Sequence, residues 1–294
     1  MSGHLLCFGF GYSAQALARQ LGPEWHMTGT SRGEPDASMS ADRHVPLLHF
    51  DRDHPLDPTA FAGVTHVLVS VPPDDSGDPV FDRHRDDIAA IPDLAWLGYL
   101  STTGVYGDRD GGWVEETAEL RPTAERGARR VAAEAAWLGL WRDRGVPVHI
   151  FRLAGIYGPG RSPFDALRAG TARRIDKPGQ VFSRIHVDDL AGVLCASIAR
   201  PRPGAIYNVC DDEPASPADV IVHAAGLLGV PAPPLMPFEA VALSPMARSF
   251  YADNKRVSNA LIKQELGVRL RYPDYRAGLA AILAAESSRQ PGGG

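Results

Sequence analysis

Cysteine is scarce in this chain, and its few cysteines lie far apart. Cys7, Cys195 and Cys210 are the only three, and no two of them form a Cys-x-x-Cys pair. This spacing argues against a disulfide framework and against a zinc site, and it favours a reducing, cytoplasmic compartment. The histidines likewise have no metal-ligand spacing, so we predict no metal.

Basic excess and long apolar runs are also missing. The formal net charge is -5, which argues against a nucleic-acid partner because such proteins need a basic face for phosphates. No apolar stretch approaches the roughly 20 residues that span a bilayer, so we expect no membrane partner. With 294 residues, 44% of them hydrophobic, the chain is long enough for one large core or two modest domains.

Short apolar runs alternate with helical patterns along the first half of the chain, as in βαβ units around a parallel sheet. The expected strands are residues 5–8, 25–30, 46–50, 66–71, 96–101, 148–153 and 205–209. The expected helices are residues 13–21, 81–91, 123–144, 187–199, 217–228, 255–266 and 274–286. Residues 155–179 are expected to be loop-rich, and the Pro-rich residues 231–245 to wind over a surface.

The pattern predicts an α/β fold: a Rossmann-type doubly wound parallel sheet with a smaller C-terminal substrate lobe. We expect an NAD(P)-binding domain at residues 1–158, to which residues 187–210 return. Residues 159–186 and 211–288 are expected to form the substrate lobe, and residues 289–294 a disordered tail.

A glycine-rich turn between the first strand and the first helix is typical of dinucleotide binding. It runs Gly9-Phe10-Gly11-Tyr12-Ser13-Ala14, a G-x-G-x-x-A pattern. The first glycine permits the tight turn, the second lets a pyrophosphate approach the backbone, and the small third residue lets helix and strand pack closely. The phosphates then meet the free N–H groups at the helix N-terminus. The alternative is a glycine-rich turn without a ligand.

The end of the second strand favours NADP over NAD. An NAD site usually places an acidic residue there for the ribose 2′-hydroxyl, whereas this chain has Ser31 and Arg32, which suit a 2′-phosphate. Arg32 as a solvated loop charge is the alternative, and the nearby Glu34 and Asp36 keep NAD open.

Two further strand ends are predicted to border the cofactor. Asp51 follows the third strand and is placed to accept a hydrogen bond from the adenine amino group, or else to shape the turn before Pro55. Ser70 and Val71 end the fourth strand, where backbone passes beside the cofactor ribose.

Four segments together resemble the extended short-chain dehydrogenase/reductases, which include sugar-nucleotide epimerases and dehydratases. They are YLSTTGVYGD at residues 99–108, RLAGIYGPG at 152–160, RIHVDDL at 184–190 and IYNV at 206–209. The resemblance implies a catalytic Ser or Thr after the fifth strand, here Thr102, and a Tyr-x-x-x-Lys pair on the next helix. The Tyr of that pair exchanges the hydroxyl proton during hydride transfer.

This chain departs from the family at that pair. The run Arg130-Val131-Ala132-Ala133-Glu134 resembles the family's Lys-x-x-x-Glu, so Arg126 stands at the Tyr position and Arg130 at the Lys position. Residues four apart share one helix face, so both point toward the nicotinamide. The same departure marks the atypical short-chain dehydrogenases, which this chain resembles more closely.

Arginine is not an acid or base at physiological pH, so the proton must come from elsewhere or is not needed. We predict Tyr106 as its source, with Tyr157 and His186 as weaker candidates and a structural ring as the alternative for Tyr106. The predicted catalytic residues are therefore Thr102, Tyr106 and Arg130.

The substrate is predicted to be small and anionic or sugar-like. Guanidinium suits bidentate binding of carboxylate or phosphate, so Arg126 is expected to clamp it; two solvated arginines are the alternative. In the family the segment with Arg184 and His186 faces substrate, and Arg161 is expected to reach the same cleft.

We therefore predict an NADP-dependent oxidoreductase or epimerase-like enzyme. The alternative is a non-catalytic NADP-binding regulatory or redox-sensing protein. A homodimer is also open, because the helix at residues 123–144 commonly builds the subunit interface in this family. Trp137 and Trp141 would form its apolar seam, or would equally pack onto the sheet.

Overall fold

A parallel sheet forms the centre of the molecule in a computed structural model, which describes residues 2–33 and 45–289. Within these residues the sheet has seven strands in the order β11-β7-β5-β4-β1-β2-β3. The strands are β1 (Gly3–Phe8), β2 (Trp25–Ser31), β3 (Leu47–His49), β4 (His66–Val69), β5 (Trp96–Thr102), β7 (Val148–Leu153) and β11 (Ile206–Val209). The order reverses between β1 and β4, which is where doubly wound sheets bind ligands.

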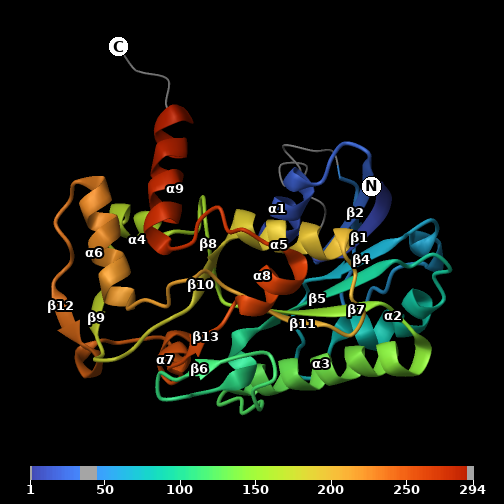
Figure 1. Cartoon of the computed structure of the whole chain (residues 1–294), viewed down its shortest axis with the longest axis horizontal. Coiled ribbons are helices and arrows are strands. Elements are labelled where there is room, and N and C mark those ends of the chain that lie inside the picture. Colours follow the sequence, from blue (N-terminus) through green and yellow to red (C-terminus); the bar gives the residue numbers. More distant parts are fainter. Residues whose placement is uncertain (1, 34–44, 290–294) are drawn as a thin grey trace.

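Helices cover both faces of the sheet (Figure 1). One face packs against α1 (Tyr12–Gln20), α5 (Val187–Ala199) and α8 (Ala260–Leu266), and the other against α2 (Pro79–Ala89) and α3 (Glu125–Arg144). Burial on both faces explains why the strands read as continuous apolar runs, as in β4, where all four residues are buried. The expected Rossmann-type fold is therefore confirmed.

A smaller lobe follows β7 and lies to the left of the sheet in Figure 1. Its core includes Tyr157, Phe164, Val220, Tyr275 and Leu279. Its elements are β8 (Gly155–Tyr157), α4 (Pro163–Arg168), β9 (Arg174–Asp176), β10 (Arg184–His186), α6 (Pro217–Leu228), β12 (Leu235–Pro237), α7 (Pro245–Tyr251) and α9 (Tyr275–Arg289). In the sequence, α5 and β11 lie between parts of this lobe, and they belong to the sheet and its covering helices. The exact domain limits stay a prediction. Residues 290–294 of the predicted tail lie outside the described residues, and Arg289 ends α9.

Several expected elements differ from the observed ones. The helix predicted at residues 255–266 is wrong at its start, because β13 (Arg256–Val257) precedes α8. There the backbone N–H groups of Arg256 and Ser258 donate to the carbonyl groups of Gly112, just before β6 (Trp113–Val114), and of Val114 within it. These N–H groups are therefore not available to a helix. The expected loops hold β8, α4, β9 and β12, and short 3₁₀ helices lie at η2 (Pro58–Phe61), η3 (Thr103–Tyr106) and η4 (Phe238–Ala240).

Trp137 on α3 packs inward rather than forming an exposed seam. Its ring is fully buried, lies 5.1 Å from that of Phe81, and donates to Asp78 at 3.3 Å. Trp141 is partly buried against the same core. The three cysteines are free, and no helix among the described residues is long and apolar enough to cross a bilayer.

Candidate functional site

A cavity of about 860 Å³ lies where the carboxyl ends of the strands meet the smaller lobe. One end is bordered by the β1–α1 turn and the segment after β4, and the other by α3, α7 and the strand β10. The predicted site residues that line it are Gly11, Tyr12, Ser13, Ser70, Thr102, Arg126, Arg130, Arg161 and Arg184. The fold thus brings residues from six distant segments to one space.

The β1–α1 turn has the features that a pyrophosphate requires. Gly9 has a φ of +85°, and a Cβ there would lie 2.6 Å from the Ser70 hydroxyl. A Cβ on Gly11 would meet no atom within 4 Å, because this residue faces the cavity. No side chain caps α1, and no acid lies in its first turn, so its N–H groups are free for an anion. These residues fit a dinucleotide phosphate.

The far end of the predicted cofactor site is only partly described. Ser31 ends β2, and Arg32 follows as an exposed side chain that does not line the cavity. Glu34 and Asp36, which bear on the choice between NAD and NADP, lie outside the described residues.

Asp51 shapes a turn after β3. Its Oδ1 accepts from the backbone N–H groups of Asp53 and His54 at 2.8 and 2.9 Å, and His49 Nε2 lies 3.1 Å from Oδ2. The His54 ring and these backbone bonds lower the pKa of Asp51 to about 2. Among the described residues, His49, Asp51 and His54 are the one group whose potential metal-ligand atoms cluster, all within 4.8 Å. Asp51 therefore has the turn role that the sequence left open, and its adenine contact stays a prediction.

The segment after β4 is held firmly at the edge of the cavity, which its Pro72 and Pro73 line. Ser70 donates to the Gly9 carbonyl at 2.6 Å, which ties this segment to the glycine-rich turn. Val71 packs into the core beside the sheet instead of lining the cavity.

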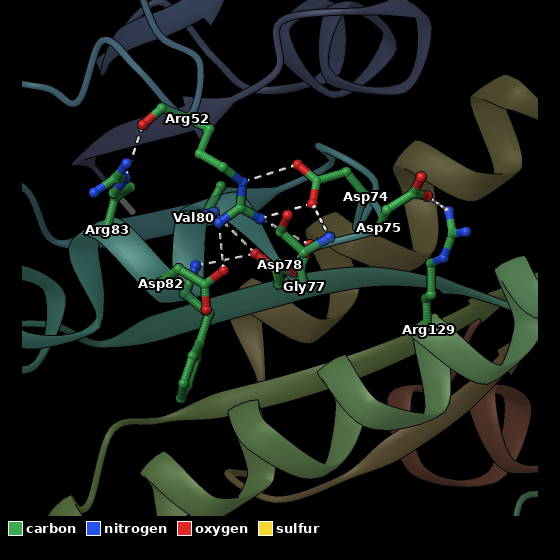
Figure 2. Close-up of polar contacts among 11 residues, drawn as sticks. Arg52, Asp74, Asp75, Gly77, Asp78, Val80, Asp82, Arg83 and Arg129 are labelled. Atoms are coloured by element: carbon green, nitrogen blue, oxygen red, sulfur yellow. Dashed lines mark hydrogen bonds and ion pairs between the residues drawn. The ribbon is translucent and has the colours of Figure 1, made fainter.

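Figure 2 shows that Arg52 binds several groups in the segment after β4 and in α2. Its guanidinium reaches Asp74 at 2.8 Å, Asp82 of α2 at 2.6 Å and the Gly77 carbonyl at 3.2 Å. Arg129 of α3 adds an ion pair with Asp75 at 2.5 Å. The loop over the cavity is thus attached to the β3 turn, α2 and α3.

Thr102 and Arg130 border the cavity where the nicotinamide is expected. The Thr102 hydroxyl oxygen accepts from the Gly104 N–H at 3.1 Å, which leaves its own O–H free to donate. Arg130 lies over β5, and its NH1 donates to the Leu100 carbonyl at 2.5 Å and to the Tyr99 hydroxyl at 3.1 Å. Both residues therefore line one cavity, and their catalytic roles stay predictions.

Tyr106 does not line the cavity. Its ring is fully buried, and its hydroxyl donates to Asn208 at 2.6 Å and accepts from Arg152 at 2.9 Å. Arg152 itself forms a buried ion pair with Glu134 of α3 at 2.8 Å. Burial raises the pKa of Tyr106 to about 12. The structural alternative fits this ring, and we do not propose Tyr106 as a proton donor.

Arg126 faces the cavity from the first turns of α3. Its guanidinium carbon lies 3.9 Å from the centre of the exposed Phe250 ring on α7. Among the described residues, it has no hydrogen bond or ion pair that would neutralise its charge. The next arginine along the helix differs, because Arg129 is paired with Asp75 and Glu125.

The remaining predicted substrate residues separate into two groups. Arg161 is exposed above the Tyr12 ring, and Arg184 lines the cavity with a buried NH1 that has no hydrogen-bond partner in the described structure.

His186 does not line the cavity; it is buried, and its Nδ1 accepts from the Asp188 N–H at 3.2 Å as the cap of α5. Burial lowers the pKa of His186 to about 4, so its ring is neutral. Asp189 in the first turn of α5 accepts from the backbone N–H groups of Arg271 and Tyr272.

Lys255 and Asp253 line the cavity although no sequence motif identified them. They precede β13, which pairs with β6 after the fifth strand. No spacing connects residues 253–255 with residues 102–130, because only tertiary pairing brings them together. Phe250 and Tyr251 of α7 were missed for the same reason.

Comparison with known proteins decides the family. Residues 93–210 match the NAD dependent epimerase/dehydratase family. Protein YeeZ of Escherichia coli (strain K12) is 30% identical over 284 residues, which cover 90% of this chain and 95% of that protein. The chain belongs to the NAD-dependent epimerase/dehydratase family, an oxidoreductase family within the extended short-chain dehydrogenase/reductase superfamily.

Solved structures resemble nearly the whole chain. A functionally unknown conserved protein from Silicibacter pomeroyi DSS is 54% identical, with a TM-score of 0.90, and the match covers 96% of this chain and 99% of that one. UDP-glucuronic acid 4-epimerase from Bacillus cereus, in complex with NAD, is 15% identical with a TM-score of 0.76, covering 98% and 100%. At that identity the epimerase supports the fold alone.

Proposed function

We propose that this protein is an NADP-dependent oxidoreductase with an epimerase-like site, acting on a small anionic or sugar-like substrate. One observation carries the proposal: a single cavity joins the uncapped N-terminus of α1 to the guanidinium of Arg126, which has no ion pair among the described residues. The first feature suits a cofactor pyrophosphate, and the second a substrate carboxylate or phosphate. The buried, unpartnered NH1 of Arg184 adds a second position for substrate anions.

The chain's own residues would bind and orient the reactants. The α1 N–H groups hold the pyrophosphate, and Arg130 is fixed on β5 so that its remaining N–H groups face a ribose or an anion. The free O–H of Thr102 points a donor at a substrate oxygen. A bound nicotinamide supplies or removes the hydride.

Substitution of Arg126 tests the anion clamp. We expect Arg126→Ala to raise the KM for an anionic substrate about 10- to 100-fold, since a charge-assisted bond contributes about 1.5–3 kcal/mol. The Kd of NADPH, measured by its fluorescence, should change little. Arg144→Ala is the matched control, because Arg144 ends the same helix, pairs with Asp86 and does not line the cavity. An unchanged KM in Arg126→Ala would reject the clamp.

Preference for NADP depends on Arg32. This exposed guanidinium follows β2 directly, and a 2′-phosphate offers it a charged partner that a 2′-hydroxyl does not. We expect Arg32→Ala to weaken NADPH about 10-fold or more and NADH much less. Equal effects on the two cofactors would reject the 2′-phosphate assignment.

A second candidate is an NADP-binding regulatory or redox-sensing protein without turnover. The buried position of Tyr106 favours it, since the proton source predicted from the sequence is not in the cavity. Tight NADPH binding combined with no oxidation of NADPH by any member of a carbonyl-substrate panel would support this candidate over the enzyme.

A further inference from the structure

The cavity needs a proton source, and its tyrosines are poor ones. The Tyr12 hydroxyl donates to the Pro159 carbonyl, and burial raises its pKa to about 12. The Tyr157 hydroxyl donates to the Asp274 carbonyl, and burial raises its pKa as well. Burial also raises the pKa of Tyr251. Each phenol on the cavity wall therefore holds its proton more tightly than a free tyrosine does, and the arginines release none.

Lys255 is the lysine that lines this cavity, and its ammonium group is held in place. Its side chain is only 11% exposed, and Nζ donates to the Gly107 carbonyl at 2.8 Å and to Asp253 Oδ2 at 2.9 Å. An ammonium has three N–H bonds, so one remains for a ligand. The backbone around it is fixed, since the Arg109 and Gly111 N–H groups both donate to the Asn254 carbonyl at 2.9 and 3.0 Å.

Lys255 lies near the start of the helix on which the family's tyrosine is missing. Gly107 directly follows η3, which begins after Thr102, and Asp253 accepts from the hydroxyl of Thr123 just before α3. Arg126 lies in the first turn of the same helix. Lys255 therefore approaches the entrance of α3 from the opposite lobe and shares the cavity wall with Thr102 and Arg126.

We propose that Lys255 is the proton donor of this cavity, in place of the tyrosine that Arg126 has replaced. The proposal rests on the proposed oxidoreductase function. In the reducing direction, NAD(P)H gives a hydride to the substrate carbonyl carbon, and a Lys255 N–H bond breaks to deliver a proton to the carbonyl oxygen. The products are an alcohol, NAD(P)⁺ and a neutral amine, which regains its proton from water through Asp253 and the exposed Thr123.

The surroundings of Lys255 suit this cycle. Burial lowers the pKa of Lys255, and the charge of Arg109 lowers it further. The hydrogen bond and charge of Asp253 and the charge of Asp108 oppose this shift. A lysine shifted toward neutrality is a better general acid than an ordinary one.

The decisive variant is Lys255→Arg. Arginine can keep the charge and the bonds to Asp253 and Gly107, but it does not release a proton. We expect Lys255→Arg and Lys255→Met to lower kcat about 10²- to 10⁴-fold while the Kd of NADPH changes less than about twofold. The assay follows NADPH oxidation with a panel of 2-oxo acids and keto-sugar phosphates. Lys263→Met is the control, because Lys263 pairs with Asp212 at 2.5 Å away from the cavity.

A pH profile separates proton transfer from a structural role. The wild-type kcat should fall as pH rises through the pKa of Lys255, and this limb should disappear from the residual rate of Lys255→Arg. The chain has only three lysines, so ¹³C-methylation and NMR titration can report the pKa of Lys255 directly, with the urea-unfolded protein as reference. We expect a lower pKa in the folded protein.

Two failures would have different meanings. Turnover by the wild type with a wild-type kcat in Lys255→Arg would overturn the proton-donor assignment and leave the oxidoreductase standing. Absence of NADPH oxidation by the wild type across the whole panel would overturn the oxidoreductase function itself, and the donor with it.

Discussion

At the scale of single residues, the exchange of Tyr and Lys for Arg126 and Arg130 changes what this cavity can do. A phenol and an amine can trade protons near neutral pH, whereas two guanidinium groups bind anions and do not titrate. Arg130 keeps a positioning role through its bond to the Leu100 carbonyl. Arg126 lies over the Phe250 ring, has no ion pair among the described residues, and is available to a substrate anion.

A buried histidine makes a prediction at the same scale. His149 bonds to the Leu97 carbonyl through Nδ1, and its Nε2 accepts from the Arg202 N–H at 2.8 Å, so protonation of Nε2 would remove an acceptor. Burial lowers its pKa from 6.5 to about 4. Its neutral form therefore stabilises the fold above pH 6.5, and this stability is lost as pH falls toward 4, by about 1.4 kcal/mol per unit.

Urea unfolding between pH 7 and pH 4.5 checks this expectation. As pH falls, His149→Gln should lose unfolding free energy less steeply than the wild type. The difference in slope should correspond to about one proton bound on unfolding. Equal slopes in the wild type and His149→Gln would contradict the assignment.

At the scale of elements, the β1–α1 turn assigns its two glycines to different tasks. Gly9 serves the fold, since its φ of +85° and the nearby Ser70 hydroxyl leave no room for a side chain. Gly11 serves the ligand, since a Cβ there would enter open space in the cavity. The same tripeptide thus carries a structural requirement and a binding requirement that substitution can separate.

Two alanine variants test this division. We expect Gly9→Ala to lower the free energy of unfolding by about 1–3 kcal/mol, because it imposes a strained backbone conformation. Gly11→Ala should leave stability within about 0.5 kcal/mol but weaken NADPH binding about 10-fold or more, by blocking approach of the pyrophosphate. Denaturant titration and NADPH fluorescence measure the two effects, and full-strength NADPH binding by Gly11→Ala would reject the ligand role.

At the scale of the whole molecule, two lobes enclose one cavity, and a ligand there should hold them together. Residues from β1 to β5 supply the cofactor side, and α7, β10 and the segment before β13 supply the other. Binding to the folded state alone stabilises a protein by mass action, about 2.7 kcal/mol at 100 times the Kd. For a chain of this size, we expect a rise in Tm of about 5 °C.

Thermal unfolding with and without NADPH measures this rise. Gly11→Ala at the same NADPH concentration is the control, and its shift should be much smaller. A wild-type Tm that does not respond to saturating NADPH would contradict binding in this cavity.

Local patterns carried the fold and the cofactor side of the site. Each strand, each helix and the G-x-G-x-x-A turn depends on residues that are close together in the sequence. The order of strands in a doubly wound sheet follows from the alternation of strands and helices along the chain. Thr102, Arg126 and Arg130 were predictable because they lie on segments that the family motif spans. The helix predicted at residue 255 failed because its first residues bond to β6, a partner more than a hundred residues away.

The sequence by itself therefore determined the sheet, the glycine-rich turn and the loss of the tyrosine, because each depends on neighbours along the chain. Only the tertiary structure decided which side chains meet in the cavity. It buried Tyr106 against Asn208, made His186 the cap of α5 and placed Lys255 on the cavity wall. It also left Arg126 without a counter-charge among the described residues. These outcomes depend on pairing and burial between distant segments, which no local spacing records.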